Sequence, residues 1–214
     1  MPETVASASL LFFVTASLLL IVAPGPDILF LITQGVTGGR AAGLSTALGL
    51  AAGNLVHTLA AALGVSVIFR TSALAFAALK VAGVAYLLYL AWQALRHRGQ
   101  LLRLENGAAA GSGLSLFRRG LLMNILNPKV ALFFLAFLPQ FAAPEAGPVW
   151  LQMVGLGALF TVLVVLVFGT IGLTAGSLAG WIRRGTGARA NRWAAWGVAG
   201  VFAALAVRLA LVER

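Results

Sequence analysis

The chain has 214 residues, of which 61% are hydrophobic and only 9% are charged, and it carries a net charge of +10 and no cysteine. This composition argues against a soluble fold, and the lack of cysteine excludes disulfides and thiolate chemistry. The basic residues stand in short segments between apolar runs, a pattern typical of the loops of a membrane protein rather than of a nucleic-acid-binding surface.

The apolar stretches predict an all-α polytopic membrane protein with about six spans embedded in the lipid bilayer. A helix needs roughly 20 mostly apolar residues to cross a bilayer, and several stretches are that long. The expected helices, in chain order, cover residues 6–35, 41–69, 72–96, 115–141, 147–180 and 191–212. Turn residues or charges separate them at 38–40, 70–72, 97–115, 144–148 and 185–187.

The first expected span is interrupted by the motif Ala23-Pro24-Gly25-Pro26-Asp27. A proline removes a backbone hydrogen bond and clashes with the preceding turn, so Pro24 and Pro26 should unwind the helix here. Inside a membrane, the freed polar groups are tolerated only where they are buried in protein or line an aqueous cavity. The motif therefore predicts a cavity near the middle of the membrane, with Asp27 beside it.

The second expected span has Gly49, Gly53, His57 and Ala61 at four-residue spacing, with Asn54 next to them. The small residues place a close packing surface on one helix face. Asn54 and His57 are candidates to line the cavity, and His57 is a candidate proton relay because the ordinary pKa of histidine lies near neutrality. A histidine hydrogen-bonded to a neighbouring backbone is the alternative. No carboxylate has ligand spacing to His57, so no metal site is predicted.

The third span contains Lys80, whose long stem could reach the outer surface, and a linker of small residues follows at 105–113. This linker divides a single membrane domain, residues 1–214, into a unit at 1–104 and a unit at 114–214. Three spans in each unit place the two units in opposite orientations, which is the inverted-repeat plan of many secondary transporters.

The fourth span, which heads the second unit, carries the motif Asn127-Pro128-Lys129 at the position that corresponds to the first break. Asp27 and Lys129 would match the ammonium and the carboxylate of an amino-acid zwitterion, with help from the amides after Pro128. The alternative is an Asp27–Lys129 ion pair that only locks the two broken helices together. Asp27 is also a candidate proton carrier, because burial favours its neutral form.

The distribution of basic residues predicts the orientation. The third and fifth connections are strongly basic, whereas the second has only Arg70 and the fourth only Glu145. Cationic side chains favour the cytoplasm, so connections one, three and five are expected inside and both termini on the periplasmic or extracellular side. Glycine stripes such as Gly172, Gly176 and Gly180 suit helix packing and are compatible with a homodimer.

Together these motifs resemble the LysE/RhtB family of bacterial amino-acid exporters. The resemblance rests on 24–27, 38–43, 49–57, 80–87 and 127–134, with Ala91 where many members have glycine. It implies a small-molecule exporter of the inner membrane that is driven by a proton gradient, works by alternating access and needs no cofactor. The resemblance implies that the Pro-Gly-Pro element of the family corresponds to residues 24–26 and that its Asn-Pro-Lys element corresponds to residues 127–129. The expected substrate-binding set is Pro24, Gly25, Pro26, Asp27, Asn54, His57, Asn127, Pro128 and Lys129.

Two other functions compete with this interpretation. The wider superfamily includes exporters of metal cations, but the scarcity of acidic residues and the absence of cysteine argue against that activity. An intramembrane enzyme would use Asp27 as an acid or base, yet no second carboxylate, nucleophile or metal site accompanies it. The sequence therefore favours a transporter over an enzyme.

Overall fold

The computed structural model describes residues 2–23, 25–65, 73–96 and 111–183 and isolated positions between 196 and 210. Within these ranges the regular structure is helical and contains no strand, which agrees with the predicted all-α fold. The main helices are α1 (Pro2–Val22), α2 (Pro26–Ala60), α4 (Ala73–Arg96), α5 (Gly113–Ile125), α6 (Pro128–Leu132) and α7 (Val149–Arg183). Short π and 3-10 segments are η1 (Ala61–Val65), η2 (Phe133–Phe137), η3 (Leu138–Phe141) and η4 (Pro144–Ala146).

The break predicted in the first span is present. Helix α1 ends at Val22 and α2 begins at Pro26, with Gly25 in an extended conformation as its N-cap. Pro26 occupies the first position of α2, where a missing N–H group breaks no helical hydrogen bond. Pro24 lies outside the described residues.

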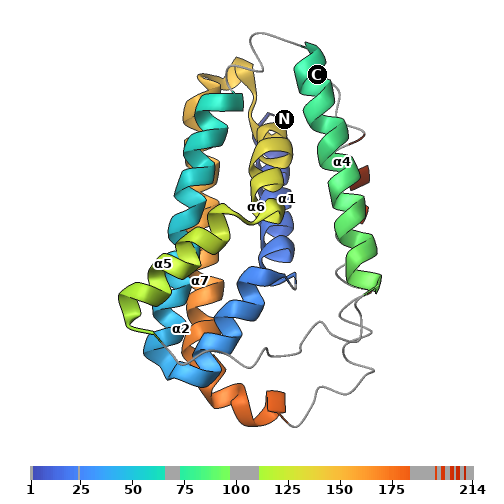
Figure 1. Cartoon of the computed structure of the whole chain (residues 1–214). Coiled ribbons are helices and arrows are strands. Elements are labelled where there is room, and N and C mark those ends of the chain that lie inside the picture. The colour runs from blue at the N-terminus through green and yellow to red at the C-terminus, as the bar shows by residue number, and fades with distance from the viewer. Residues whose placement is uncertain are drawn as a thin grey trace.

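Helix α2 consists of two arms that fold back on each other at Gly39. The backbone of Gly39 has φ 76° and ψ −169°, a region that is essentially restricted to glycine. A methyl group on Gly35 would lie 3.8 Å from the Cα atom of Gly43. Eight residues of a straight helix span about 12 Å, so the chain has reversed direction between these glycines. The boundary predicted at 38–40 is therefore a turn, which Figure 1 shows at the lower end of α2.

The break predicted in the fourth span is also present. Helices α5 and α6 meet at a 50° bend, and the Asn127 side chain accepts a hydrogen bond of 3.0 Å from the Lys129 backbone. Asn127 thereby caps α6, and Pro128 occupies its first position as Pro26 does in α2. The chain then continues through η2 and η3 toward the turn at η4, where Gly147 has φ 128°. The predicted break at 144–148 is confirmed.

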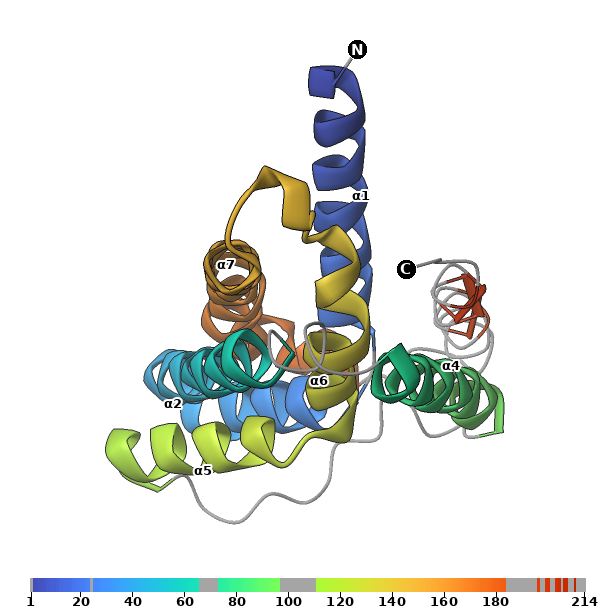
Figure 2. The same cartoon turned by 90° about the horizontal axis from the view of Figure 1, so that it is seen from above.

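Glycines bring the helices of the bundle into close contact. A methyl group on Gly43 would overlap the backbone of Gly172 in α7, and one on Gly49 would overlap the backbone of Phe117 in α5. The packing face predicted for the second span is thus used against α5. Figure 2 shows α2 between α5 and α7, with α6 near the centre of the molecule. Helix α4 contacts α6 and η2.

Several helices are long and apolar enough to cross a membrane. Val149–Ala175 qualifies alone, and Gly113–Ile125 with Pro128–Phe141 qualifies as one bent span. Pro26–Gly64 also qualifies, but the turn at Gly39 divides it. Most of the predicted sixth span, the connections at 70–72, 97–110 and 185–187 and the Lys80 side chain lie outside the described residues. The number of six spans, the inverted repeat and the unit boundaries therefore stay predictions.

Candidate substrate site

The two proline breaks meet in the interior of the protein. The Lys129 side chain is buried, and its Nζ atom donates hydrogen bonds of 3.1 Å to the carbonyl oxygens of Leu20 and Ala23. Carbonyl groups in the last turn of a helix have no helical partner and form the negative end of the helix dipole. Lys129 from α6 therefore caps the end of α1. Gly25 leaves room for this contact, because a methyl group there would lie 3.2 Å from Nζ.

Asp27 occupies the first turn of α2, where the positive end of the helix favours a carboxylate. Its side chain is only 2% exposed, and its Oδ2 atom accepts a hydrogen bond of 2.9 Å from Nδ2 of Asn124. The other oxygen, Oδ1, has no hydrogen-bond partner. No hydrogen bond joins Asp27 to Lys129, since the lysine donates to the end of α1. The hydrogen bonds of each charged side chain thus go to other groups: Asp27 binds Asn124 of α5, and Lys129 binds the end of α1.

Asn124, in the last turn of α5, is a site residue that the sequence interpretation missed. It is buried, its side chain binds Asp27, and its backbone oxygen lies 3.0 Å from Nε2 of His57. Its position offered a signal. Asn124 lies one helical turn before Asn127, and a second buried amide on that side of the break indicates a polar site rather than a simple kink.

His57 holds the end of α5 as Lys129 holds the end of α1. Because a carbonyl oxygen only accepts hydrogen bonds, Nε2 of His57 carries the hydrogen that points to Asn124. The ring also stacks on Phe134, with ring centroids 5.7 Å apart. The described contacts therefore match the alternative in which this histidine binds a neighbouring backbone.

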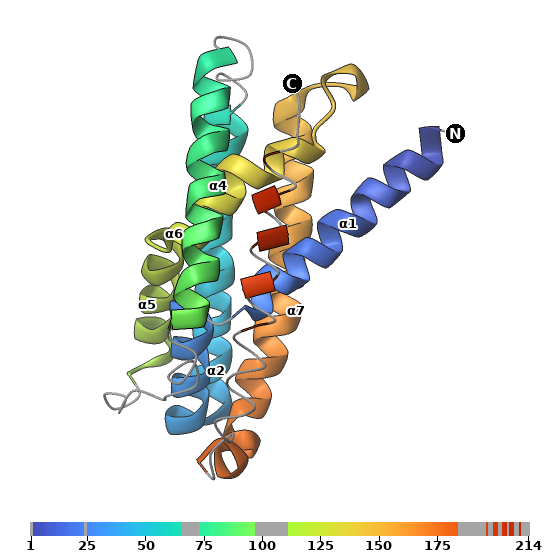
Figure 3. The same cartoon turned by 90° about the vertical axis from the view of Figure 1, so that its right-hand side faces the viewer.

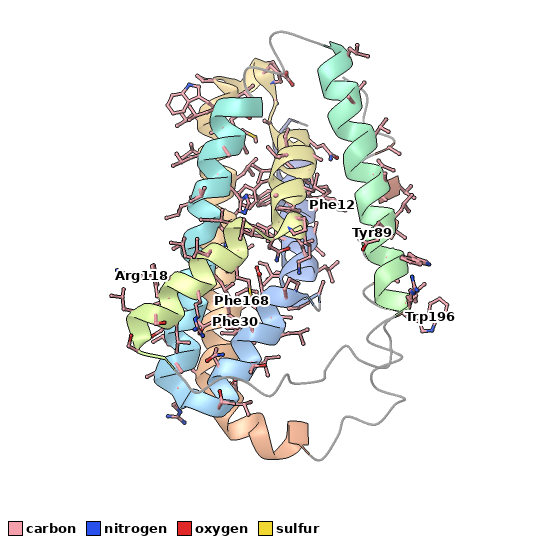
Figure 4. All side chains as sticks on the ribbon, in the orientation of Figure 1. Phe12, Phe30, Tyr89, Arg118, Phe168 and Trp196 are labelled. Atoms are coloured by element: carbon pink, nitrogen blue, oxygen red, sulfur yellow. The ribbon has the colours of Figure 1, made fainter. Side chains whose placement is uncertain are left out.

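A small cavity lies where the broken helices meet α7. The space open to the centre of a water molecule is about 10 Å³, enough for about one water. Its polar lining is Asp27, Asn54, Asn124 and Lys129, and its apolar lining is Leu20, Ile21, Val130, Phe160, Val164 and Phe168. Figure 4 labels Phe168, which belongs to the wall formed by α7. The cavity has a polar end and an apolar side.

Three acceptor atoms of the lining are buried without a hydrogen-bond partner: Oδ1 of Asp27, Oδ1 of Asn54 and Oδ1 of Asn124. Buried polar atoms are nearly always hydrogen-bonded, and an unpaired one costs about 1–3 kcal/mol. A group of unpaired acceptors beside a cavity therefore indicates a position for a hydrogen-bond donor.

Aromatic side chains close the cavity on the side of η3. Phe160 of the lining packs against Phe133 and Phe134, with ring centroids 4.9 and 5.2 Å apart. Phe133 in turn packs against Phe137, which meets Phe141 at 5.1 Å. These rings form a continuous apolar barrier from the cavity to the end of η3.

The structure brings together only part of the predicted substrate-binding set. Asp27, Asn54 and Lys129 line the cavity. Around it, Gly25 contacts Lys129, Asn127 caps α6 and His57 binds α5, whereas Pro26 and Pro128 are exposed and start their helices. Pro24 is not described. Among the described residues, no group of three or more histidine, aspartate or glutamate side chains is placed to hold a metal ion.

Comparison with known proteins gives a consistent picture. Residues 18–213 match the family model described as LysE type translocator. The chain is 32% identical to an uncharacterized membrane protein of Pseudomonas aeruginosa, over 92% of this chain and 93% of the relative. It is also 32% identical to the homoserine/homoserine lactone efflux protein of Salmonella typhimurium, over 80% of this chain and 82% of the relative. It is 30% identical to an uncharacterized membrane protein of Bacillus subtilis, over 75% of this chain and 80% of the relative. No solved structure matches.

Proposed function

Because the chain belongs to the LysE-type translocator family, and so is a membrane transporter rather than an enzyme, we propose that it exports amino acids or closely related metabolites across the bacterial inner membrane. The observation that carries this proposal is the buried polar cavity at the junction of the two broken helices. Relatives named as homoserine/homoserine lactone efflux proteins support a substrate of that size and chemistry.

The cavity lining suits such a molecule. Asp27, Asn54 and Asn124 offer oxygen atoms to an ammonium group, and Phe160 and Val164 offer apolar surface to a short side chain. The space of about 10 Å³ is too small for a whole amino acid. We therefore interpret this structure as a conformation in which the cavity is closed to substrate. We propose that the helices around the cavity must separate before a substrate can bind.

Alternating access gives this separation a structural basis. Among the described residues, three hydrogen-bonded contacts cross between residues 1–104 and residues 114–214: Asn124 with Asp27, Asn124 with His57, and Lys129 with the end of α1. All three connect the ends of broken helices. We propose that these contacts break and re-form as the two units move, and that the aromatic barrier at Phe133 opens on the other side.

Asp27 is our leading candidate for proton coupling, and His57 is the second. An ionised Asp27 attracts a substrate ammonium, whereas a protonated Asp27 does not. Proton and substrate would therefore compete for the same carboxylate. A proton arriving from outside would displace the substrate and be carried inward, which couples export to the proton gradient.

Reconstitution into liposomes tests this function. Vesicles are loaded with radiolabelled L-homoserine, L-threonine or L-lysine, and the release of the label is measured with and without a pH gradient. The wild type is expected to release at least one of them faster when a gradient is imposed. Asp27→Asn should abolish that response, whereas Glu145→Gln, the same change at an exposed carboxylate outside the cavity, should preserve it. Release of none of a full amino-acid panel would contradict the proposal.

A further inference from the structure

We infer that the site selects its substrate by a primary ammonium group, bound by Asp27, Asn54 and Asn124, and that it reserves no side chain for a substrate carboxylate. This inference rests on the proposed function and narrows its substrate class. It assigns recognition to two asparagines, only one of which the sequence indicated, and it assigns Lys129 to the architecture of the site.

The acceptor atoms match an ammonium group in number and kind. Oδ1 of Asp27, Oδ1 of Asn54 and Oδ1 of Asn124 are all buried and unpaired, and the three residues line one cavity. An ammonium group has three N–H donors and no acceptor. A hydroxyl group donates only one hydrogen and a water molecule two, so each would leave at least one buried oxygen unpaired.

The orientation of both amides follows from their neighbours. Nδ2 of Asn124 donates to the carboxylate of Asp27 at 2.9 Å, and Nδ2 of Asn54 faces the carbonyl oxygen of Leu50 at 3.5 Å. Both partners only accept hydrogen bonds. A flipped amide would place two oxygens against each other, so the oxygen of each asparagine is the atom left for a ligand.

The substrate carboxylate has no comparable partner. Lys129 is the only cationic side chain in the cavity lining described, and two of its three N–H groups already bind the carbonyl oxygens of Leu20 and Ala23. Releasing them would expose the end of α1. Phe160, Val164 and Phe168 form the opposite, apolar wall. A carboxylate therefore contributes little to binding, and a neutral ester or amide can replace it.

Ligand binding to the purified protein in detergent tests this directly. The probes are L-homoserine, L-homoserine amide and 2,4-dihydroxybutanoate, which has a hydroxyl group in place of the ammonium. The dissociation constants come from thermal shift. We expect the amide to bind within tenfold of homoserine, and the hydroxy acid to bind at least 30-fold more weakly than homoserine.

Variants of the asparagines separate recognition from folding. Asn54→Leu should weaken homoserine binding at least tenfold, because it removes the acceptor oxygen and keeps a side chain of similar size. Gln140→Leu is a matched control. Gln140 also donates to the carbonyl group four residues earlier and has an unpaired buried oxygen, but it does not line the cavity. The Gln140→Leu variant should bind homoserine with the affinity of the wild type. Without ligand, each variant must have the melting temperature of the wild type.

The outcomes distinguish this inference from the proposed function. Equal binding of the hydroxy acid, loss of binding with the amide, or no thermal shift with any probe overturns the inference. If homoserine is exported while its hydroxy acid is exported equally well, the export function stands and ammonium selection falls. If all three probes bind as expected but no member of the amino-acid panel is exported, ammonium selection stands and the proposed function falls.

Discussion

Asn124 joins three parts of the site through one residue. Its side chain binds Asp27 at the start of α2, its backbone oxygen binds His57 in the second arm, and its free oxygen faces the cavity. This crowding is possible because Gly53 has no side chain. A methyl group on Gly53 would lie 2.5 Å from Oδ1 and 2.7 Å from Cβ of Asn124. The glycine is therefore part of the site although it carries no chemistry.

Replacing Gly53 tests this arrangement. Gly53→Ala should push Asn124 away from Asp27, weaken homoserine binding at least tenfold and destabilise the protein by about 1–3 kcal/mol, the usual effect of overpacking a core. Thermal shift reports both effects. Gly169→Ala is the control, because Gly169 is also buried in a helix but a methyl group there meets no atom within 4 Å. Equal behaviour of the two variants would contradict the assigned role of Gly53.

Lys129 provides a second test at the scale of one residue. Lys129→Gln removes the positive charge and shortens the side chain that donates to two carbonyl groups at the end of α1, and we expect a loss of about 2–3 kcal/mol, or a melting temperature lower by roughly 5–10 °C. Arg119→Gln, an exposed cation on α5, should change it little. The exchange Asp27→Lys with Lys129→Asp should not restore stability, because each charge is held by a helix end. Restoration would instead indicate a direct ion pair.

At the scale of the elements, the sequence predicted the interruptions better than their partners. Pro26 and Pro128 act on their own helices, so a proline motif is sufficient to locate a break. The contact of Lys129 with the end of α1 joins residues more than 100 positions apart, and no local pattern encodes it. Asn54 was predicted in the cavity because it lies beside the glycine face. Asn124 was missed because its role depends on how α5 meets α2.

The turn at Gly39 is an element that a single substitution should disturb. Its φ of 76° and ψ of −169° are essentially inaccessible to side-chain-bearing residues, at a cost of about 1–3 kcal/mol. No atom lies within 4 Å of an added methyl group, so Gly39→Ala isolates backbone strain from crowding. We expect a lower melting temperature, whereas Gly155→Ala, in the helical backbone of α7 and equally uncrowded, should not lower it. An unchanged Gly39→Ala variant would contradict the turn.

At the scale of the whole molecule, the described parts of the chain that carry or adjoin basic segments lie at one end. The turn of α2 carries Arg40, and α5 begins close to it, since a methyl group on Gly113 would lie 3.0 Å from Oγ of Ser45. Helix α7 ends at Arg183 at the same end, and η4 lies at the other, as Figures 1 and 3 show. Arg118, labelled in Figure 4, is exposed on the outer side of α5. The fold thus groups the charges that the positive-inside rule uses.

The orientation that follows can be tested with single cysteines, because the chain has none of its own. If the basic end faces the cytoplasm, a membrane-impermeant maleimide should label Ala146→Cys in intact cells and Leu114→Cys only after permeabilisation. Both positions are exposed at opposite ends, and neither change alters a charge. Leu166→Cys, on the exposed apolar face of α7, should react weakly in both conditions. The reverse labelling pattern would show that the protein has the opposite orientation in the membrane. Protons from outside would then reach the proposed site from the end at Arg40.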